Sequence, residues 1–236
     1  MGVEGPIFCR HKFNYTPRVS SNEITGLACV GPNVFMIQNY RKMVKTNKLD
    51  PEDERDYDNI VPTGGRIINF WISPFSPDFF VFSTLQNGLQ HTMYMPPNKK
   101  RPDTIKDLKT KEVTSVAWVN KNTVIMGTAD GDIWSCNFED SVGFFGSITT
   151  MKHYTIKDES ISGLVTCSLQ PSVDSTKAKR LVLAATKQKL IHFIGPEISP
   201  ETGLDKVFSN GCTGNQSNNF NAKKLILRIK CYIFQN

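Results

Sequence analysis

The sequence predicts an all-β protein built from repeated small sheets. A short run of alternating apolar residues returns after steps of 43, 46 and 48 residues. Its copies begin at Ile24, Ile67, Val113 and Ile161. Turn residues divide each repeat into segments of strand length, and apolar residues with helical spacing are scarce. Together these observations predict a partial, WD-repeat-like β-propeller of about four blades, followed by an irregular C-terminal tail.

Composition agrees with a folded domain. The 236 residues are 39% hydrophobic and 21% charged, and fifteen Phe and three Trp supply bulky core side chains. There is no apolar run of about 18 residues and no apolar N-terminal stretch, so we expect neither a membrane span nor a signal peptide. None of the six cysteines forms a C-x-x-C pair, which predicts no zinc site. Without a secretion signal, we expect reduced thiols in a cytoplasmic protein.

Three regions follow from the pattern: a leader over 1–23, the partial propeller over 24–205, and a tail over 206–236 that is disordered or unrelated to the repeats. In the first repeat, strands are expected at 24–30 and 34–37, and 42–48 is expected to be a further part of the blade. Residues 50–58 (DPEDERDYD) are expected to be an acidic loop. A calcium-binding EF-hand loop starting at Asp50 would need Gly at Arg55 and Glu at Val61, so that site is not expected.

The second and third repeats have clear turn signals. In the second, strands at 67–72, 79–84 and 89–95 surround the Asn87-Gly88 hairpin signal, and 96–111 is expected to be a linker. The third has strands at 113–119, 123–128 and 133–138. Its Asp130-Gly131 pair suits a type I′ turn. Asp130 and Asp132 resemble a paired-carboxylate site, but turn residues bonded to nearby backbone are the favoured interpretation.

The fourth repeat completes the expected series. A first strand starts at Ile161, a polar loop covers 170–179, and two strands follow at 180–186 and 190–195. Residues 209–219 are polar and expected to be disordered. The segment 223–234 (KKLILRIKCYIF) has three interpretations: an edge strand, a segment that binds a partner or membrane surface, or a sticky end without a role. The third is favoured because no turn and no matching strand follow it.

The net charge of +6 is not organised for nucleic acid, because aromatic residues do not interleave with the basic clusters. Solvated loops between strands are the favoured interpretation of these clusters. The alternative is weak contact of Lys99, Lys100 and Arg101, together with the basic tail, with an anionic membrane surface. This alternative predicts salt-sensitive binding to anionic liposomes.

The sequence contains no G-x-S-x-G, H-E-x-x-H or G-x-G-x-x-G motif and no phosphate-binding loop. The histidines, His11, His91, His153 and His192, lie in different segments, so none is expected to be a catalytic base. We therefore predict no catalytic, cofactor-binding or metal-binding residues and no enzyme activity. The alternative that remains is an enzyme whose site lies in the propeller channel, assembled from distant loops.

The third and fourth repeats resemble the N-terminal β-propeller of the vacuolar protein sorting-associated protein 18 (deep orange) family. The residues that carry the likeness are 116–118, 124–133 and above all 181–195 (LVLAATKQKLIHFIG). The resemblance covers 24–195. It implies a subunit of the HOPS and CORVET tethering complexes, which support vesicle docking and SNARE-driven fusion at endosomes and at lysosomes or vacuoles.

The resemblance also implies partners and a location. The partners would be other tethering-complex subunits, and the Rab GTPases and SNAREs with which such complexes work. The location would be cytoplasmic, peripheral on the late endosome and the lysosome or vacuole. Complete family members continue into a helical solenoid and a RING-like domain, which this sequence lacks. We therefore interpret the chain as a truncated product, with a self-contained four-bladed propeller as the alternative.

Overall fold

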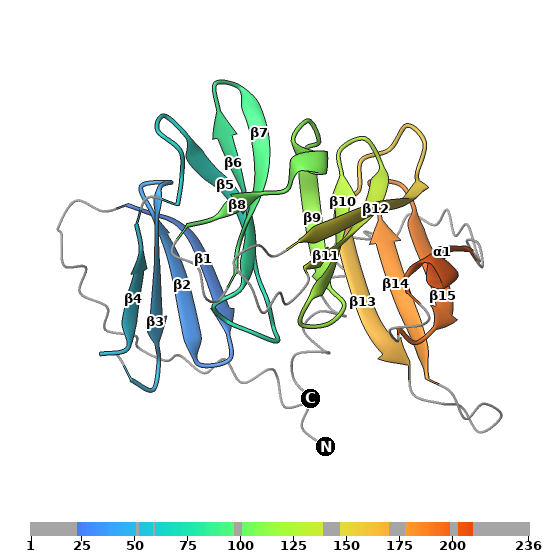
Figure 1. Cartoon of the computed structure of the whole chain (residues 1–236), viewed down its shortest axis with the longest axis horizontal. Helices are drawn as coiled ribbons and strands as arrows, with labels where there is room; N and C mark the ends of the chain where they lie inside the picture. Colours follow the sequence, from blue (N-terminus) through green and yellow to red (C-terminus); the bar gives the residue numbers. More distant parts are fainter. Residues whose placement is uncertain are drawn as a thin grey trace, which may run out of the picture. The chain divides into compact units, whose positions relative to one another are not determined.

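The structure, a computed structural model, describes residues 23–50, 52–58, 60–96, 101–138, 147–169, 178–198 and 203–209. The chain divides into two compact units, Met1–Ile60 and Val61–Asn236. The described strands form four antiparallel sheets of three or four strands each, one for each predicted repeat (Figure 1). This arrangement confirms the predicted all-β propeller class with about four blades. None of the described helices is long and apolar enough to cross a membrane.

The first unit contains one sheet, drawn in blue in Figure 1. Its strands pair in chain order: β1 (Ile24–Val30), β2 (Asn33–Gln38), β3 (Lys42–Asn47) and β4 (Glu54–Tyr57). The short β4 corrects the prediction of an acidic loop over 50–58. Tyr57 is buried and lies opposite Met43 on β3. Lys42 forms an ion pair with Asp56 at 2.5 Å, so the acidic segment is held by one buried ring and one neighbouring cation.

The second sheet begins the larger unit and contains β5 (Arg66–Ile72), β6 (Phe80–Gln86), β7 (Leu89–Met95) and β8 (Asp103–Thr104). The predicted Asn87-Gly88 hairpin is confirmed, because both residues have positive φ and Gln86 pairs with Leu89. The predicted linker over 96–111 is wrong in part. It contains β8 and a 3₁₀ turn, η1 (Lys106–Leu108), and buries Ile105 and Leu108 completely.

The third and fourth sheets follow. The third contains β9 (Val113–Trp118), β10 (Thr123–Thr128), β11 (Asp132–Phe138) and β12 (Ile148–Thr155). The sequence did not indicate β12, which is an edge strand with largely exposed residues. The described part of the fourth sheet contains β13 (Gly163–Leu169), β14 (Lys179–Ala185) and β15 (Leu190–Pro196). A short helix, α1 (Asp205–Ser209), contacts β15, so packed structure continues past the end of this strand.

Alternation along the strands packs these sheets face to face. On β10, Val124 and Met126 belong to a cluster shared with the second sheet, whereas Ile125 belongs to a cluster shared with the fourth. The first cluster also contains Phe79 and Tyr94, with Trp118 packed against it. β10 therefore buries both of its faces, which is how adjacent blades stack.

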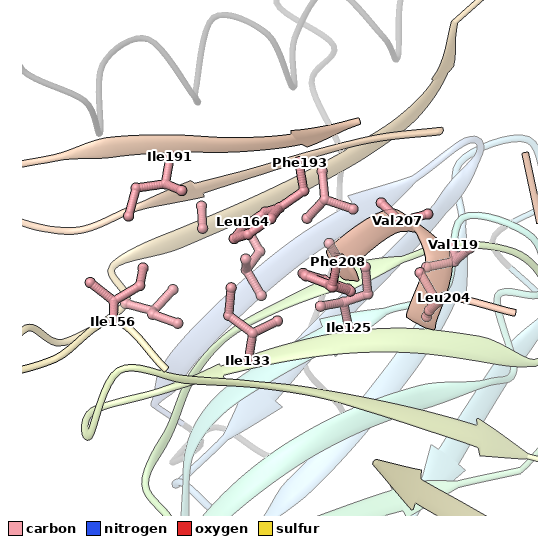
Figure 2. Packing of buried hydrophobic residues seen from close by; sticks show 14 residues of the cluster. Val119, Ile125, Ile133, Ile156, Leu164, Ile191, Phe193, Leu204, Val207 and Phe208 are labelled. Carbon is pink, nitrogen blue, oxygen red and sulfur yellow. The ribbon is translucent and has the colours of Figure 1, made fainter. Parts of the chain in front are cut away.

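The second cluster joins the third sheet, the fourth sheet and α1. Ile133 comes from β11, Phe193 from β15, and Val207 and Phe208 from α1, and Figure 2 shows these side chains meeting. The Phe193 ring lies 5.0 Å from that of Tyr154 and 4.8 Å from that of Phe208. Gly195 is required where α1 crosses β15, because a Cβ there would lie 2.5 Å from the Cα of Val207. This packing fixes the loops at the ends of the two sheets.

Candidate functional site

Three connections come together at one end of the third and fourth sheets, and we call them the loop rim. They are the β10–β11 turn (129–131), the β12–β13 loop (156–162) and the β14–β15 turn (186–189). Backbone hydrogen bonds join the first two: the N–H of Ile156 donates to Gly131 at 2.8 Å, and the N–H of Ile161 donates to Thr128 at 3.1 Å. The rim is therefore one fixed surface built from segments distant in sequence.

Gly131 permits the tightest contact in the rim. Its φ is +84°, a conformation that L side chains rarely adopt. A Cβ at this position would lie 2.1 Å from the carbonyl oxygen of Ile156 and 2.5 Å from that of Glu159. A turn forms at Asp130-Gly131 as predicted, but the predicted type I′ is wrong, because of these two residues only Gly131 has positive φ, and the N–H of Gly131 closes the turn by donating to Thr128 at 3.1 Å. The glycine serves a second purpose that the sequence did not reveal. It lets the β10–β11 turn lie directly against the next loop.

Asp132 is the buried anion beneath the rim. Its carboxylate accepts hydrogen bonds from Thr155 at 2.7 Å and from Lys152 at 3.1 Å, and Lys111 lies 3.2 Å from its other oxygen. The exposed Asp130 shares Lys111 at 2.8 Å. Hydrogen bonds to both aspartates raise the pKa of Lys111. The two aspartates thus lock a turn to neighbouring segments through side-chain partners, whereas the favoured interpretation had them bonded to nearby backbone.

The pKa of Asp132 predicts how the stability of the fold depends on pH. Burial raises the pKa of this carboxyl, but hydrogen bonds from Thr155, Lys152 and Lys111 outweigh burial and lower it below the usual 3.8. The carboxylate therefore stabilises the fold above the unfolded-state pKa, and that stability is lost as pH falls through the lower folded-state value. We expect Asp132→Asn to cost about 1–2 kcal/mol at pH 7, by urea unfolding followed by tryptophan fluorescence.

The cost of Asp132→Asn should shrink as the pH is lowered from 5 toward 2, because the wild-type carboxyl becomes protonated. Asp130→Asn is the matched control, since its side chain lies in the same turn but is 61% exposed. We expect this control to change stability by less than about 0.5 kcal/mol. A cost of Asp132→Asn that is constant across this pH range would contradict the assigned ion pairs.

A second ion pair holds the other end of the rim. Lys189 lies 2.5 Å from the Glu159 carboxylate, which also accepts a hydrogen bond from the Thr186 hydroxyl. These contacts with Lys189 and Thr186 lower the pKa of Glu159. Thr186 also accepts hydrogen bonds from the backbone N–H groups of Gln188 and Lys189. The β14–β15 turn, Thr186-Lys187-Gln188-Lys189, is thus closed by its own hydrogen bonds. The contacts of Glu159 tie it to the β12–β13 loop.

His153, on β12, connects this strand to α1. Its Nε2 lies 2.7 Å from the Ser135 hydroxyl, and its ring stacks on Phe208 with centroids 4.7 Å apart. Its Nδ1 lies 3.5 Å from the Asp205 carboxylate. Burial lowers the pKa of His153, and Asp205 opposes that shift only in part. The imidazole is therefore a buried group that packs β12 against α1.

The proposed membrane-contact residues are only partly covered by the structure. Arg101 is exposed, whereas Lys99 and Lys100 lie outside the described residues, as does the segment 223–234. Among the described residues, no group of three or more His, Cys, Asp or Glu side chains could hold a metal ion. Sequence reasoning missed Lys111, Lys152 and Glu159, whose ion pairs hold the rim in place. No local motif marks them, because their partners come from other strands.

Comparison with known proteins identifies the family of the chain. The family model of the Pep3/Vps18/deep orange beta-propeller domain matches residues 6–228. This match extends beyond both ends of the resemblance at 24–195. No curated protein matches the sequence.

A solved β-propeller supports the same fold. The Cps50 (Swd1) β-propeller domain of Myceliophteria thermophila is similar at 11% identity with a TM-score of 0.51. The match covers 83% of this chain and 60% of that domain. Oligogalacturonate lyase in complex with manganese gives a TM-score of 0.45 at 11% identity, over 74% of this chain and 50% of the lyase. The Cps50 likeness supports the propeller fold, and the chain spans only about 60% of that domain.

Proposed function

Because the chain belongs to the Pep3/Vps18/deep orange β-propeller family, we propose that it is a non-catalytic protein-interaction module of a HOPS/CORVET-type tethering subunit. In this role it contacts other subunits of the complex, and through them the Rab GTPases and SNAREs of vesicle docking and fusion. Its place is the cytoplasmic face of the late endosome and the lysosome or vacuole. Family membership is the observation that carries the proposal.

The loop rim gives the proposal a surface. Its backbone is fixed by Gly131 and by two ion-paired clusters, so binding a partner there would not have to order the loops. Lys157 and Lys187 project from the rim as exposed cations. Exposed charges of this kind steer association and select partners more than they add affinity. The rim therefore suits recognition of an acidic surface on another subunit.

The test is direct binding between the purified chain and purified subunits of the tethering complex, measured by biolayer interferometry. We expect saturable binding that the double change Lys157→Glu and Lys187→Glu weakens at least about tenfold. Lys179→Glu is the matched control, because Lys179 is exposed at the opposite end of β14 and should leave binding unchanged. Absence of binding to every subunit would overturn the proposal. Binding that is insensitive to the double change would exclude the rim.

A further inference from the structure

The tip of the β6–β7 hairpin is an exposed Asn-Gly pair. Both residues of Asn87-Gly88 have positive φ, at +51° and +77°. The strands on either side are held by glutamines. The side-chain amide of Gln86 donates to the carbonyl of Thr63 at 2.8 Å, and that of Gln90 donates to the carbonyl of Val113 at 3.2 Å. The base of the hairpin is therefore anchored to other segments, and its tip projects into solvent.

The groups at this tip are accessible to each other and to water. No atom lies within 4 Å of the Cβ position of Gly88, so the space beside this residue is open. In the part of the chain that the structure describes, no hydrogen bond holds the side-chain amide of Asn87. The ladder ends at the pair Gln86 and Leu89, which leaves the Gly88 N–H outside it. An electrophilic amide carbon and an unshielded backbone nitrogen therefore lie on adjacent residues.

The first sheet contains the same kind of turn with a different second residue. Between β2 and β3, Asn39 and Tyr40 are exposed and have φ of +50° and +59°. The N–H of Arg41 closes this turn by donating to the carbonyl of Gln38 at 3.0 Å. Here the second residue carries a side chain, and Oδ1 of Asn39 accepts a hydrogen bond from the N–H of Glu23 at 2.9 Å. The two turns match in conformation and exposure, but differ in access to the nitrogen and in freedom of the amide.

We propose that Asn87 is a site of spontaneous deamidation, in which the backbone nitrogen of Gly88 attacks the side-chain carbonyl carbon of Asn87. The nitrogen loses its proton, the new C–N bond closes a cyclic imide, and the side-chain nitrogen leaves as ammonia. Water then adds to one of the two imide carbonyls and breaks its bond to the ring nitrogen. The product is an aspartyl or an isoaspartyl residue at position 87. Nothing is oxidised or reduced, and water is the co-reactant.

The attack requires rotation about the Cα–C bond of Asn87, out of the turn conformation. A hairpin tip is the part of a sheet where such local opening costs least. The side chain of Asn87 has no described bond to break, and Gly88 has no side chain to obstruct the approach. The folded hairpin therefore permits the reaction while its two strands stay paired.

The two products differ in their effect on the hairpin. The aspartyl product keeps the turn, because Asp-Gly suits a type I′ turn as Asn-Gly does. The isoaspartyl product inserts a methylene into the main chain, so Gln86 and Leu89 can no longer close a two-residue loop. This distortion lies beside Gln90, whose bond to Val113 links β7 to the start of β9. Either product replaces a neutral amide by a carboxylate.

The test is incubation of the purified, folded full chain at neutral and at mildly alkaline pH, followed by peptide mapping with mass spectrometry. We expect the peptide that contains Asn87 to gain about 1 Da with time, because NH₂ is replaced by OH. The gain should be faster at the higher pH, since the Gly88 N–H must lose its proton. Labelling with an isoaspartyl methyltransferase identifies the isoaspartyl product. Asn39 is the internal control and should react at least about tenfold more slowly, because its neighbour carries a side chain.

Two variants complete the test. Asn87→Asp is the reference for the aspartyl product and should show no further mass gain in this peptide. Gly88→Ala should slow the gain at Asn87, since a Cβ then shields the nitrogen. Equal rates at Asn87 and Asn39, or no gain at Asn87, would overturn the proposal. A gain that occurs only in urea would also overturn it, because the reaction is assigned to the folded hairpin. The inference rests on the hairpin alone, so its outcome is separate from that of subunit binding.

Discussion

Gly131→Ala is expected to be among the most destabilising single substitutions in this chain. A Cβ at Gly131 would lie 2.1 Å from the carbonyl oxygen of Ile156, which is backbone and cannot rotate away. The residue would also keep a φ of +84°, which costs an L-residue about 1–2 kcal/mol by itself. We expect a total loss of about 3 kcal/mol or more. This corresponds to a decrease of about 1.5 M in the urea midpoint.

Tryptophan fluorescence is a suitable probe, because Trp71, Trp118 and Trp134 are the three tryptophans of the chain and all lie in the larger unit. Gly88→Ala separates the two causes. Gly88 has a φ of +77°, but no atom lies within 4 Å of its Cβ position. This control should lose only about 1 kcal/mol. Equal midpoints for Gly131→Ala and Gly88→Ala would show that the contact between the turn and the loop does not form.

Phe193→Ala is expected to have an effect of similar size through packing. The ring is fully buried between Tyr154 and Phe208, in the cluster that joins two sheets and α1. Its removal loses apolar burial and leaves a cavity, which together cost about 3–5 kcal/mol for a phenylalanine. We expect the urea midpoint from tryptophan fluorescence to fall by about 2 M.

Phe75→Ala controls for the loss of an aromatic ring at an exposed position. Phe75 is 54% exposed, so its truncation should change the free energy of unfolding by less than about 0.5 kcal/mol. If Phe193→Ala left the tryptophan transition unchanged, the fourth sheet would not unfold together with the second and third sheets. The face-to-face packing described for the larger unit would then be wrong.

The strands that the sequence predicted share a clear signal. Residues 123–128 and 180–186 are apolar runs of strand length between turn residues, and both become central strands that bury two faces. The strands that it missed are edge strands. β8 has two residues, β4 is mostly charged, and β12 exposes much of its length. These three are the fourth strands of their sheets and bury little, so their residues carry no apolar alternation to read, unlike the first strands at the other edge.

The candidate site was less predictable than the fold. The presence of a turn at Asp130-Gly131 could be read from local preference, but its type could not, because Asp130 does not adopt the positive φ that a type I′ turn requires. The role of Asp132 could not be predicted from the sequence, since Lys111 and Lys152 reach its carboxylate from distant parts of the chain. The contact of Gly131 with Ile156 likewise depends on how a loop 25 residues later returns to the turn. Such contacts exist only once the sheets have packed.

The central claim is that the sheets of the larger unit pack into one scaffold that holds the loop rim. Hydrogen–deuterium exchange of the full chain, followed by mass spectrometry, tests this claim most directly. We predict that β10 and β14, the central strands of two different sheets, exchange slowly and lose protection together as urea is added. Fast exchange of β13–β15 while β9–β11 remain protected would contradict it, because the fourth sheet would then open independently of the third.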